Sequence, residues 1–266
     1  MAKRPSVGGR AYHIQLGPGE VPRYVLLPGD PGRVPLIAKF WDEAREVARN
    51  REFVTWRGRY KGVEVAATST GIGSGSTAIA VEELLAAGAD TFIRVGTTGA
   101  LRREVKLGDL IIGTAAVRWD GASRWYAPPE YPAAAHWLVV KSLIDAAESL
   151  GVRYHVGVVA STDSFYVGQE RPGFGGFMPP WARGLIDMLK SLRVLSFEME
   201  SATIFTLASI YGARTGGVYA VIANRETDEF QPEVGVEDTV KTANEAVKIL
   251  AEYDSKSGAD TRRSYY

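Results

Sequence analysis

The stretch "YVLLPGDPGR", residues 24–33, joins an apolar run to a glycine-rich turn and then to the start of a helix. Its first part, Tyr24 to Pro28, predicts a short buried strand, and the residues after Arg33 favour a helix as far as Phe40. The same order of apolar strand, turn and helix recurs along the rest of the chain. Such alternation is typical of a parallel or mixed sheet that helices cover on both faces.

The other predicted elements extend this pattern over nearly the whole sequence. We expect a hairpin over 53–69, with a turn near Lys61 and Gly62. Strands are expected at 91–96, 109–117, 155–161 and 217–224, and one leads into 197. Helices are expected at 74–87, 132–150, from about 181, at 201–211 and at 236–253. Residues 163–180 predict a long loop. We therefore predict an α/β fold with a central mixed β-sheet flanked by helices. It would form a single domain, residues 1–266, with a polar tail at about 255–266.

The amino-acid composition argues against several classes of protein. The 31 Lys and Arg residues equal the 31 Asp and Glu residues in number. The net charge therefore does not favour binding to nucleic acid or to an anionic membrane. There is no Cys and there are three His, which argues against thiolate chemistry and histidine-rich metal centres. No apolar run approaches the roughly 18 residues of a membrane span, and no apolar segment follows the basic N-terminus. We expect a cytoplasmic protein.

Two segments follow predicted strands and carry arginine among glycines. In "GDPGR", Gly29 and Gly32 allow close backbone approach and Arg33 adds donors, which suits an anion such as phosphate. A plain turn explains the same glycines. In "RVGTTGA", Arg94 lies inside an apolar strand and Thr97 offers a hydroxyl, which suggests a second anion-binding segment. The alternative is an arginine paired with an internal acid.

The other glycine-rich and loop segments are less specific. "TGIGSGST", residues 70–77, lacks the lysine of a phosphate-binding P-loop, and close packing of a strand on a helix explains its glycines better. In "DSFYVGQER", Phe165 is suited to stacking on a flat ligand. Gln169 and Arg171 are suited to the edge of a heterocycle, because a carboxamide donates and accepts whereas arginine only donates. A solvated polar loop is the alternative.

The segment "FEMES", residues 197–201, places two carboxylates where a strand meets a helix. Glu200 near a helix N-terminus would favour the macrodipole, but this does not account for Glu198. The pair resembles the two acids of a glycosidase, although Met199 between them fits a pocket wall better than a catalytic water. The two acids are also suited to accept hydrogen bonds from vicinal sugar hydroxyls. Together, these segments indicate a site for phosphate, a heterocycle and ribose.

Several of these segments occur in one characteristic order. They are "GDPGR" (29–33), "REFVTWRG" (51–58), "RVGTTGA" (94–100), "DSFYVGQER" (163–171), "FEMESAT" (197–203) and "VIANR" (221–225). From about His13 to the last helix, the chain resembles the uridine phosphorylases of the hexameric nucleoside phosphorylase family. The resemblance implies cleavage of uridine by phosphate to uracil and ribose 1-phosphate, in pyrimidine salvage. A purine nucleoside phosphorylase, a nucleoside hydrolase and a non-catalytic nucleoside-binding protein are the alternatives.

The resemblance also assigns roles to individual residues, with Arg33, Arg94, Arg171 and Glu200 as the catalytic set. Phosphate would be bound by Gly29, Arg33, Arg51, Arg94 and Thr97. Ribose would be bound by His13, Glu198, Met199 and Glu200. The base would be bound by Phe165, Gln169, Arg171 and Arg225.

Assembly and ions follow from the same resemblance. His13 and Arg51 would reach the site of a neighbouring subunit, within a homohexamer built as a trimer of dimers. A monovalent cation, K+, would bind between subunits at Glu52, Ile72 and Ser76, and no other cofactor is expected because phosphate is a co-substrate.

The chain departs from the family at a few positions. Ser74-Gly75-Ser76 stands where Gly-Pro-Ser is usual, Phe197 where Tyr is common, and Ala223 where a bulkier aliphatic residue is usual. Residues 172–182 show little likeness to the family. Since that loop would flank the base, base preference is the least constrained of these expectations.

Overall fold

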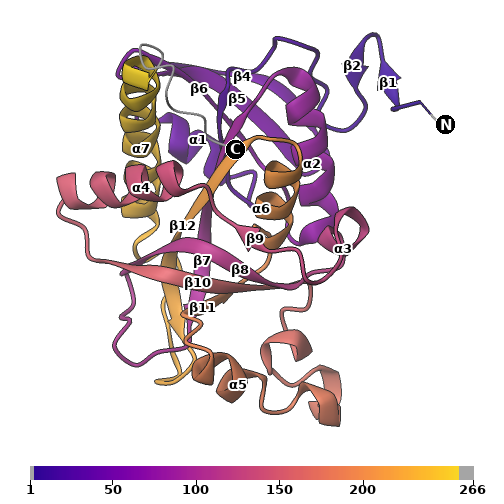
Figure 1. Cartoon of the computed structure of the whole chain (residues 1–266), viewed down its shortest axis with the longest axis vertical. Coiled ribbons are helices and arrows are strands. Elements are labelled where there is room, and N and C mark those ends of the chain that lie inside the picture. Colours follow the sequence, from indigo (N-terminus) through magenta and orange to yellow (C-terminus); the bar gives the residue numbers. More distant parts are fainter. Residues whose placement is uncertain (1–2, 258–266) are drawn as a thin grey trace.

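The fold has a central sheet between two layers of helices. The computed structural model describes residues 3–257. Helices α1 (Arg33–Ala38), α4 (Trp137–Ser149) and α7 (Val236–Ser257) lie on one face of the sheet. Helices α2 (Ser74–Ala87) and α6 (Ser201–Ile210) lie on the other face (Figure 1). The predicted α/β class with a mixed sheet flanked by helices is confirmed.

The middle of the sheet closes on itself. Five strands take part: β7 (Thr91–Ala100), β8 (Leu110–Trp119), β10 (Tyr154–Thr162), β11 (Ser196–Glu198) and β12 (Arg214–Asn224). β12 pairs in parallel with β7 and antiparallel with β8, and β10 and β11 complete the ring. Closure pairs the backbone groups that an open edge would leave exposed.

Four more strands extend the sheet from β7. In spatial order they are β3 (Tyr24–Leu27), β6 (Val63–Thr68), β5 (Phe53–Tyr60) and β4 (Glu43–Asn50). The predicted hairpin turn at Lys61 and Gly62 is confirmed, and both residues have positive φ. Strand β4 was not predicted because its sequence, "EAREVARN", is charged and largely exposed. The β4–β5 turn places Arg51 at a hairpin tip with φ of 53°.

Two predicted helices begin later than expected. The helix expected over 132–150 begins at Trp137, where His136 Nδ1 accepts a hydrogen bond from Leu138 N, and β9 (Ala133–Ala134) precedes it. The helix expected from about Trp181 is a single 3₁₀ turn there, after consecutive prolines. The α-helix α5 (Leu185–Ser191) follows it.

The last helix also differs from the expectation, since it continues to Ser257. The first residues of the predicted tail are therefore helical, and 258–266 lie outside the described residues. The remaining short elements are β1 (Ser6–Val7), β2 (Arg10–Ala11), α3 (Ser123–Tyr126) and β13 (Glu229–Phe230).

The core has one large apolar cluster on each side of the sheet and a smaller third cluster between α5 and strands β10 and β11. Neighbouring residues of β7 point to opposite faces, so Phe92 packs with Phe205 of α6 whereas Ile93 packs with Leu143 of α4 and Leu250 of α7. Within residues 3–257, no helix combines the length and the apolar character that crossing a membrane requires. The rigid sheet fixes the ends of β3, β7 and β12, where the candidate site lies.

Candidate functional site

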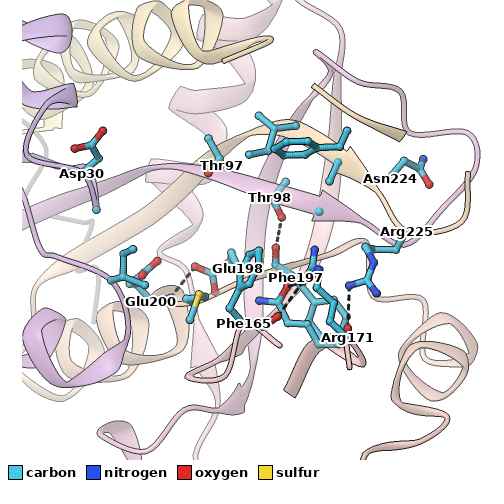
Figure 2. A pocket seen from close by; sticks show the side chains of 18 of the residues that line it. Asp30, Thr97, Thr98, Phe165, Arg171, Phe197, Glu198, Glu200, Asn224 and Arg225 are labelled. Atoms are coloured by element: carbon cyan, nitrogen blue, oxygen red, sulfur yellow. Dashed lines mark hydrogen bonds between the residues drawn. The ribbon is translucent and has the colours of Figure 1, made fainter. Parts of the chain in front are cut away.

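A cavity of about 500 Å³ opens where β3, β7 and β12 reach their carboxyl ends. Ligands of α/β folds bind at such ends, and the volume suits a small molecule. Figure 2 shows Asp30 and Glu200 on one side of the cavity and Arg171 and Arg225 on the other. The predicted site residues that line it are Gly29, Arg33, Arg94, Thr97, Phe165, Gln169, Arg171, Glu198, Met199, Glu200 and Arg225.

A buried ion pair forms one end of the cavity. Arg94 Nη2 donates to Glu200 Oε2, and Arg94 Nη1 donates to Leu27 O at 3.2 Å. Glu200 Oε1 accepts from Gly73 N at 2.7 Å. Burial raises the pKa of Glu200, and the positive charge of Arg94 opposes that shift. The alternative interpretation of Arg94, an arginine paired with an internal acid, is therefore confirmed for one of its nitrogens, Nη2.

The same end of the cavity holds a donor that no described residue satisfies and a second guanidinium group, that of Arg33. Arg94 Nε is buried and has no hydrogen-bond partner within residues 3–257. Burial and then the charge of Arg94 lower the pKa of Arg33, so the two guanidinium groups repel each other across this end. A Cβ at Gly29 would lie 3.2 Å from Arg94 Nη1, so the chain needs glycine for this close approach. Nearby carboxylates, Glu200 among them, offset the repulsion between the two guanidinium groups, so an added anion would be bound by their directed donors and not by a net positive charge.

The two acids of "FEMES" have different surroundings. Glu198 Oε2 accepts from Glu200 N at 3.0 Å and from Ser201 N at 2.9 Å, and both oxygens also bind serine hydroxyls, those of Ser161 and Ser201. Glu198 therefore caps the N-terminus of α6. Glu200 stands at the N-terminus of α6 as predicted, but its side chain makes no capping bond there and points to Arg94 and Gly73.

The other end of the cavity is formed by the loop after β10. Gln169 is only 4% exposed, and its Oε1 accepts from Arg171 Nη1. The Arg171 guanidinium lies 4.3 Å from the centre of the Phe165 ring. Burial and then the charge of Arg225 lower the pKa of Arg171 to about 10. Arg225 Nη1 also donates to Gln169 O at 2.8 Å. Contacts with Arg171 and Arg225 therefore fix the position of Gln169.

Two predicted site residues lie outside the cavity and close to each other. Asn50 Nδ2 donates to His13 O at 2.8 Å, and Arg51 Nη2 donates to Tyr12 Oη at 3.3 Å. We call these four residues, Tyr12, His13, Asn50 and Arg51, the clasp. The clasp joins the N-terminal segment to the tip of the β4–β5 hairpin.

The residues predicted to bind a monovalent cation gather around Gly71. A Cβ there would lie 2.9 Å from both Glu52 Cγ and Ser76 Oγ, and Ser76 Oγ lies 3.5 Å from Ile72 O. Ile72 also lines the cavity. Among residues 3–257, no group of three or more His, Cys, Asp or Glu side chains is placed to hold a metal ion. The oxygens near Gly71 are hard donors of the type that alkali cations prefer.

Thr98 and Gly99 belong to "RVGTTGA", the segment predicted to bind an anion, and both line the cavity. Thr98 Oγ1 donates to Phe197 O at 2.6 Å. Other residues of the cavity were not predicted. Phe230 reaches the cavity because β13 folds back on β12 and pairs Phe230 with Ala223. The only sequence signal for this group is its position at or just beyond a strand end. The others are Asp30, Phe197, Ile222, Ala223, Asn224, Asp228 and Glu229.

Known proteins are similar in sequence to this chain over most of its length. A uridine phosphorylase of Thermococcus kodakarensis is 57% identical over 266 residues, which is 100% of this chain and 96% of that protein. A uridine phosphorylase of Escherichia coli is 44% identical over 85% of this chain and 89% of its own length. A guanosine phosphorylase of Halorubrum lacusprofundi is 37% identical over 84% of this chain and 85% of its own length. The pattern that defines the Phosphorylase superfamily matches residues 23–255, and the chain therefore belongs to that superfamily.

Proposed function

We propose that this chain is a pentosyltransferase that cleaves uridine with phosphate to give uracil and ribose 1-phosphate. One observation carries the proposal: a single cavity has Arg33 and Arg94 at one end, which would bind phosphate, and Gln169 and Arg171 at the other, which would bind the base. The relatives that are named uridine phosphorylases support the same reaction.

Phosphate would bind between Gly29, Arg33, Arg94 and Thr97. Arg94 Nε is a buried donor that a phosphate oxygen would satisfy. Glu200, held by Arg94 and Gly73, would accept hydrogen bonds from the ribose hydroxyls, and Met199 would contact the sugar. Glu198 supports this arrangement through the start of α6. Fixed positions for both reactants supply much of the rate enhancement of such a transfer.

The bond from C1′ to N1 of uracil would break as a phosphate oxygen bonds to C1′. The transition state has oxocarbenium character, and bound phosphate stabilises its positive charge. The electron pair of the broken bond goes to N1, and negative charge spreads over the uracil ring. Arg171, supported by Arg225 and stacked on Phe165, would stabilise that charge, so no general acid is required.

The neighbouring subunit would complete each site. We propose that Arg51 reaches phosphate and His13 reaches the ribose 5′-hydroxyl across a dimer interface, in a homohexamer that is a trimer of dimers. Ile72 O and Ser76 Oγ lie close together and Glu52 lies beside Gly71, and a second copy would supply the remaining ligands of the cation. We place the enzyme in the cytoplasm and in pyrimidine salvage, with no cofactor beyond this cation.

A purine nucleoside is the second candidate substrate, because one relative is named a guanosine phosphorylase. The experiment that separates the candidates is a panel of uridine, deoxyuridine, thymidine, inosine, guanosine and adenosine, each assayed with and without phosphate. We expect cleavage of uridine that depends on phosphate and yields ribose 1-phosphate. Faster cleavage of guanosine would favour the second candidate, whereas free ribose in phosphate-free buffer would identify a hydrolase.

A further inference from the structure

Glu83, on α2, binds the N-terminal segment through both carboxylate oxygens. Oε2 accepts from His13 N at 3.1 Å and from Ile14 N at 2.8 Å, and Oε1 lies 2.7 Å from His13 Nδ1. The two side chains are 15% and 22% exposed. Glu83 does not line the cavity, and no part of the proposed reaction uses it. It is nevertheless the residue that fixes where His13 lies.

We propose that Glu83 is a positioning residue that holds the proton of the His13 ring on Nδ1 and presents Nε2 to the neighbouring site. An ionised carboxylate only accepts hydrogen bonds, so Nδ1 must be the donor. The edges of Tyr12 and Phe53 lie beside the ring, with centroids 4.9 and 6.3 Å away. Within residues 3–257, no hydrogen bond reaches Nε2. This inference rests on the proposed function, because the 5′-hydroxyl of the neighbour's nucleoside is the partner that Nε2 would meet.

The contacts of Glu83 extend to the second donor of the clasp. Asn50 Nδ2 binds His13 O, so the segment that Glu83 anchors is also tied to the hairpin tip that carries Arg51. At the other end of α2, Gly73 N binds Glu200 in the chain's own cavity. One helix therefore carries both the support of Glu200 and the anchor of the groups that would serve the neighbour.

The position of the ring proton can be measured without turnover. Magic-angle-spinning NMR of protein labelled with ¹⁵N in its three histidines would report the tautomer of each ring, and a His13→Ala protein would assign the signal. We expect Nδ1–H for His13 in the unmodified protein. Glu83→Gln should allow both tautomers, because an amide both donates and accepts. An Nε2–H ring in the unmodified protein, or a His13 signal that Glu83→Gln leaves unchanged, would overturn the proposal.

The consequence for catalysis is tested with uridine and 5′-deoxyuridine, which lacks the 5′-hydroxyl. We expect Glu83→Gln to lower kcat/KM for uridine about tenfold, the size of one hydrogen bond, and to leave 5′-deoxyuridine within about twofold. The matched control is Glu82→Gln on the same helix, where the carboxylate binds Arg4 and Tyr211 instead. It should change neither substrate.

The other outcomes are also decisive. Equal losses with both substrates would mean that Glu83 only supports the fold, and the proposal would be wrong. Loss in His13→Ala but not in Glu83→Gln would reject the positioning role and leave the proposed function intact. If the unmodified protein cleaves no uridine, the proposed function fails, whereas the NMR measurement still tests whether Glu83 sets the tautomer.

Discussion

The cavity and the clasp differ in how the chain holds their polar groups. In the cavity, Arg94 lies within strand β7 and Glu200 at the start of α6, and both are buried and bind backbone as well as each other. In the clasp, His13 and Arg51 come from a terminal segment and a hairpin tip, and Glu83 and the other clasp residues hold them. One chain thus forms the cavity by itself, whereas His13 and Arg51 lie apart from it.

The proposed division between groups that serve their own chain and groups that serve a neighbour follows this difference. A buried arginine must find its partners inside the fold, because leaving it unpaired is expensive. A donor on an exposed tip has no such requirement, and the positive φ of Arg51 is a strained conformation of the kind found at functional sites. The predictions below test this division, from the largest effect to the smallest.

The largest effect is expected for Arg94→Ala. Loss of a charged donor at the reacting anion should lower kcat/KM by about 10³-fold. The same change leaves Glu200 buried without its cation, which should also destabilise the fold by about 3–5 kcal/mol. The double variant with Glu200→Gln should regain much of the thermal stability and none of the activity. If Arg94→Ala retains near-normal kcat/KM, the cavity does not bind phosphate at this end.

The clasp gives the next largest effect. Arg51→Ala should lower kcat/KM about 10- to 100-fold, mainly through phosphate, because it removes a charge-assisted bond. Mixed with a Glu200→Ala chain, it should regain activity, since one of the two sites in a mixed dimer is then intact. Activity is measured after subunit exchange, with exchange followed by mass spectrometry. A mixture that exchanges but stays inactive would mean that Arg51 serves its own chain.

The sequence was sufficient for the parts of this molecule that depend on local pattern. The spacing of apolar residues and the residue types of turns predicted most strands, the Lys61–Gly62 turn and the full extent of α2. Arg94 was predicted as a site residue because it is a charged residue inside an apolar strand. The segments that follow strands supplied most of the predicted residues that line the cavity. Strand β4 was missed because an exposed edge strand needs no apolar alternation.

Partners distant in sequence could not be predicted. Asp163 opens the segment predicted to read the base, yet its carboxylate binds Ser74 N at 2.8 Å, Ser74 Oγ at 2.6 Å and Gly121 N at 2.6 Å. It therefore caps α2, and nothing near it in sequence signals this. The contact between Glu83 and His13 is of the same kind. Such pairs depend on how the whole chain folds, and a short motif carries no information about partners that are distant in sequence.

A smaller effect, on stability, is expected at Glu198. Glu198→Gln replaces one acceptor oxygen with a donor amide at the start of α6, where backbone N–H groups of Glu200 and Ser201 need acceptors. We expect a loss of about 1–2 kcal/mol in the free energy of unfolding, measured by chemical denaturation. Glu200→Gln should lower both activity and stability more, because it removes the counter-charge of the buried Arg94. If Glu198→Gln lowers activity as much as Glu200→Gln does, Glu198 also contacts the substrate and does more than cap α6.

The smallest effect at neutral pH is expected for Arg171→Lys, and it should grow with pH. Burial and Arg225 lower the pKa of Arg171 to about 10, so its guanidinium stays charged through pH 8. A lysine has an ordinary pKa of about 10.4, and the same burial and the same charge of Arg225 would lower it. Since the charged form stabilises the leaving uracil, kcat/KM of the variant relative to that of the unmodified protein should fall as pH rises from about 7 to 9. Arg183→Lys, an exposed position in the same loop region, is the control and should follow the unmodified profile. Parallel profiles for Arg171→Lys and the unmodified protein would mean that the charge at this end of the cavity does not act on the leaving group.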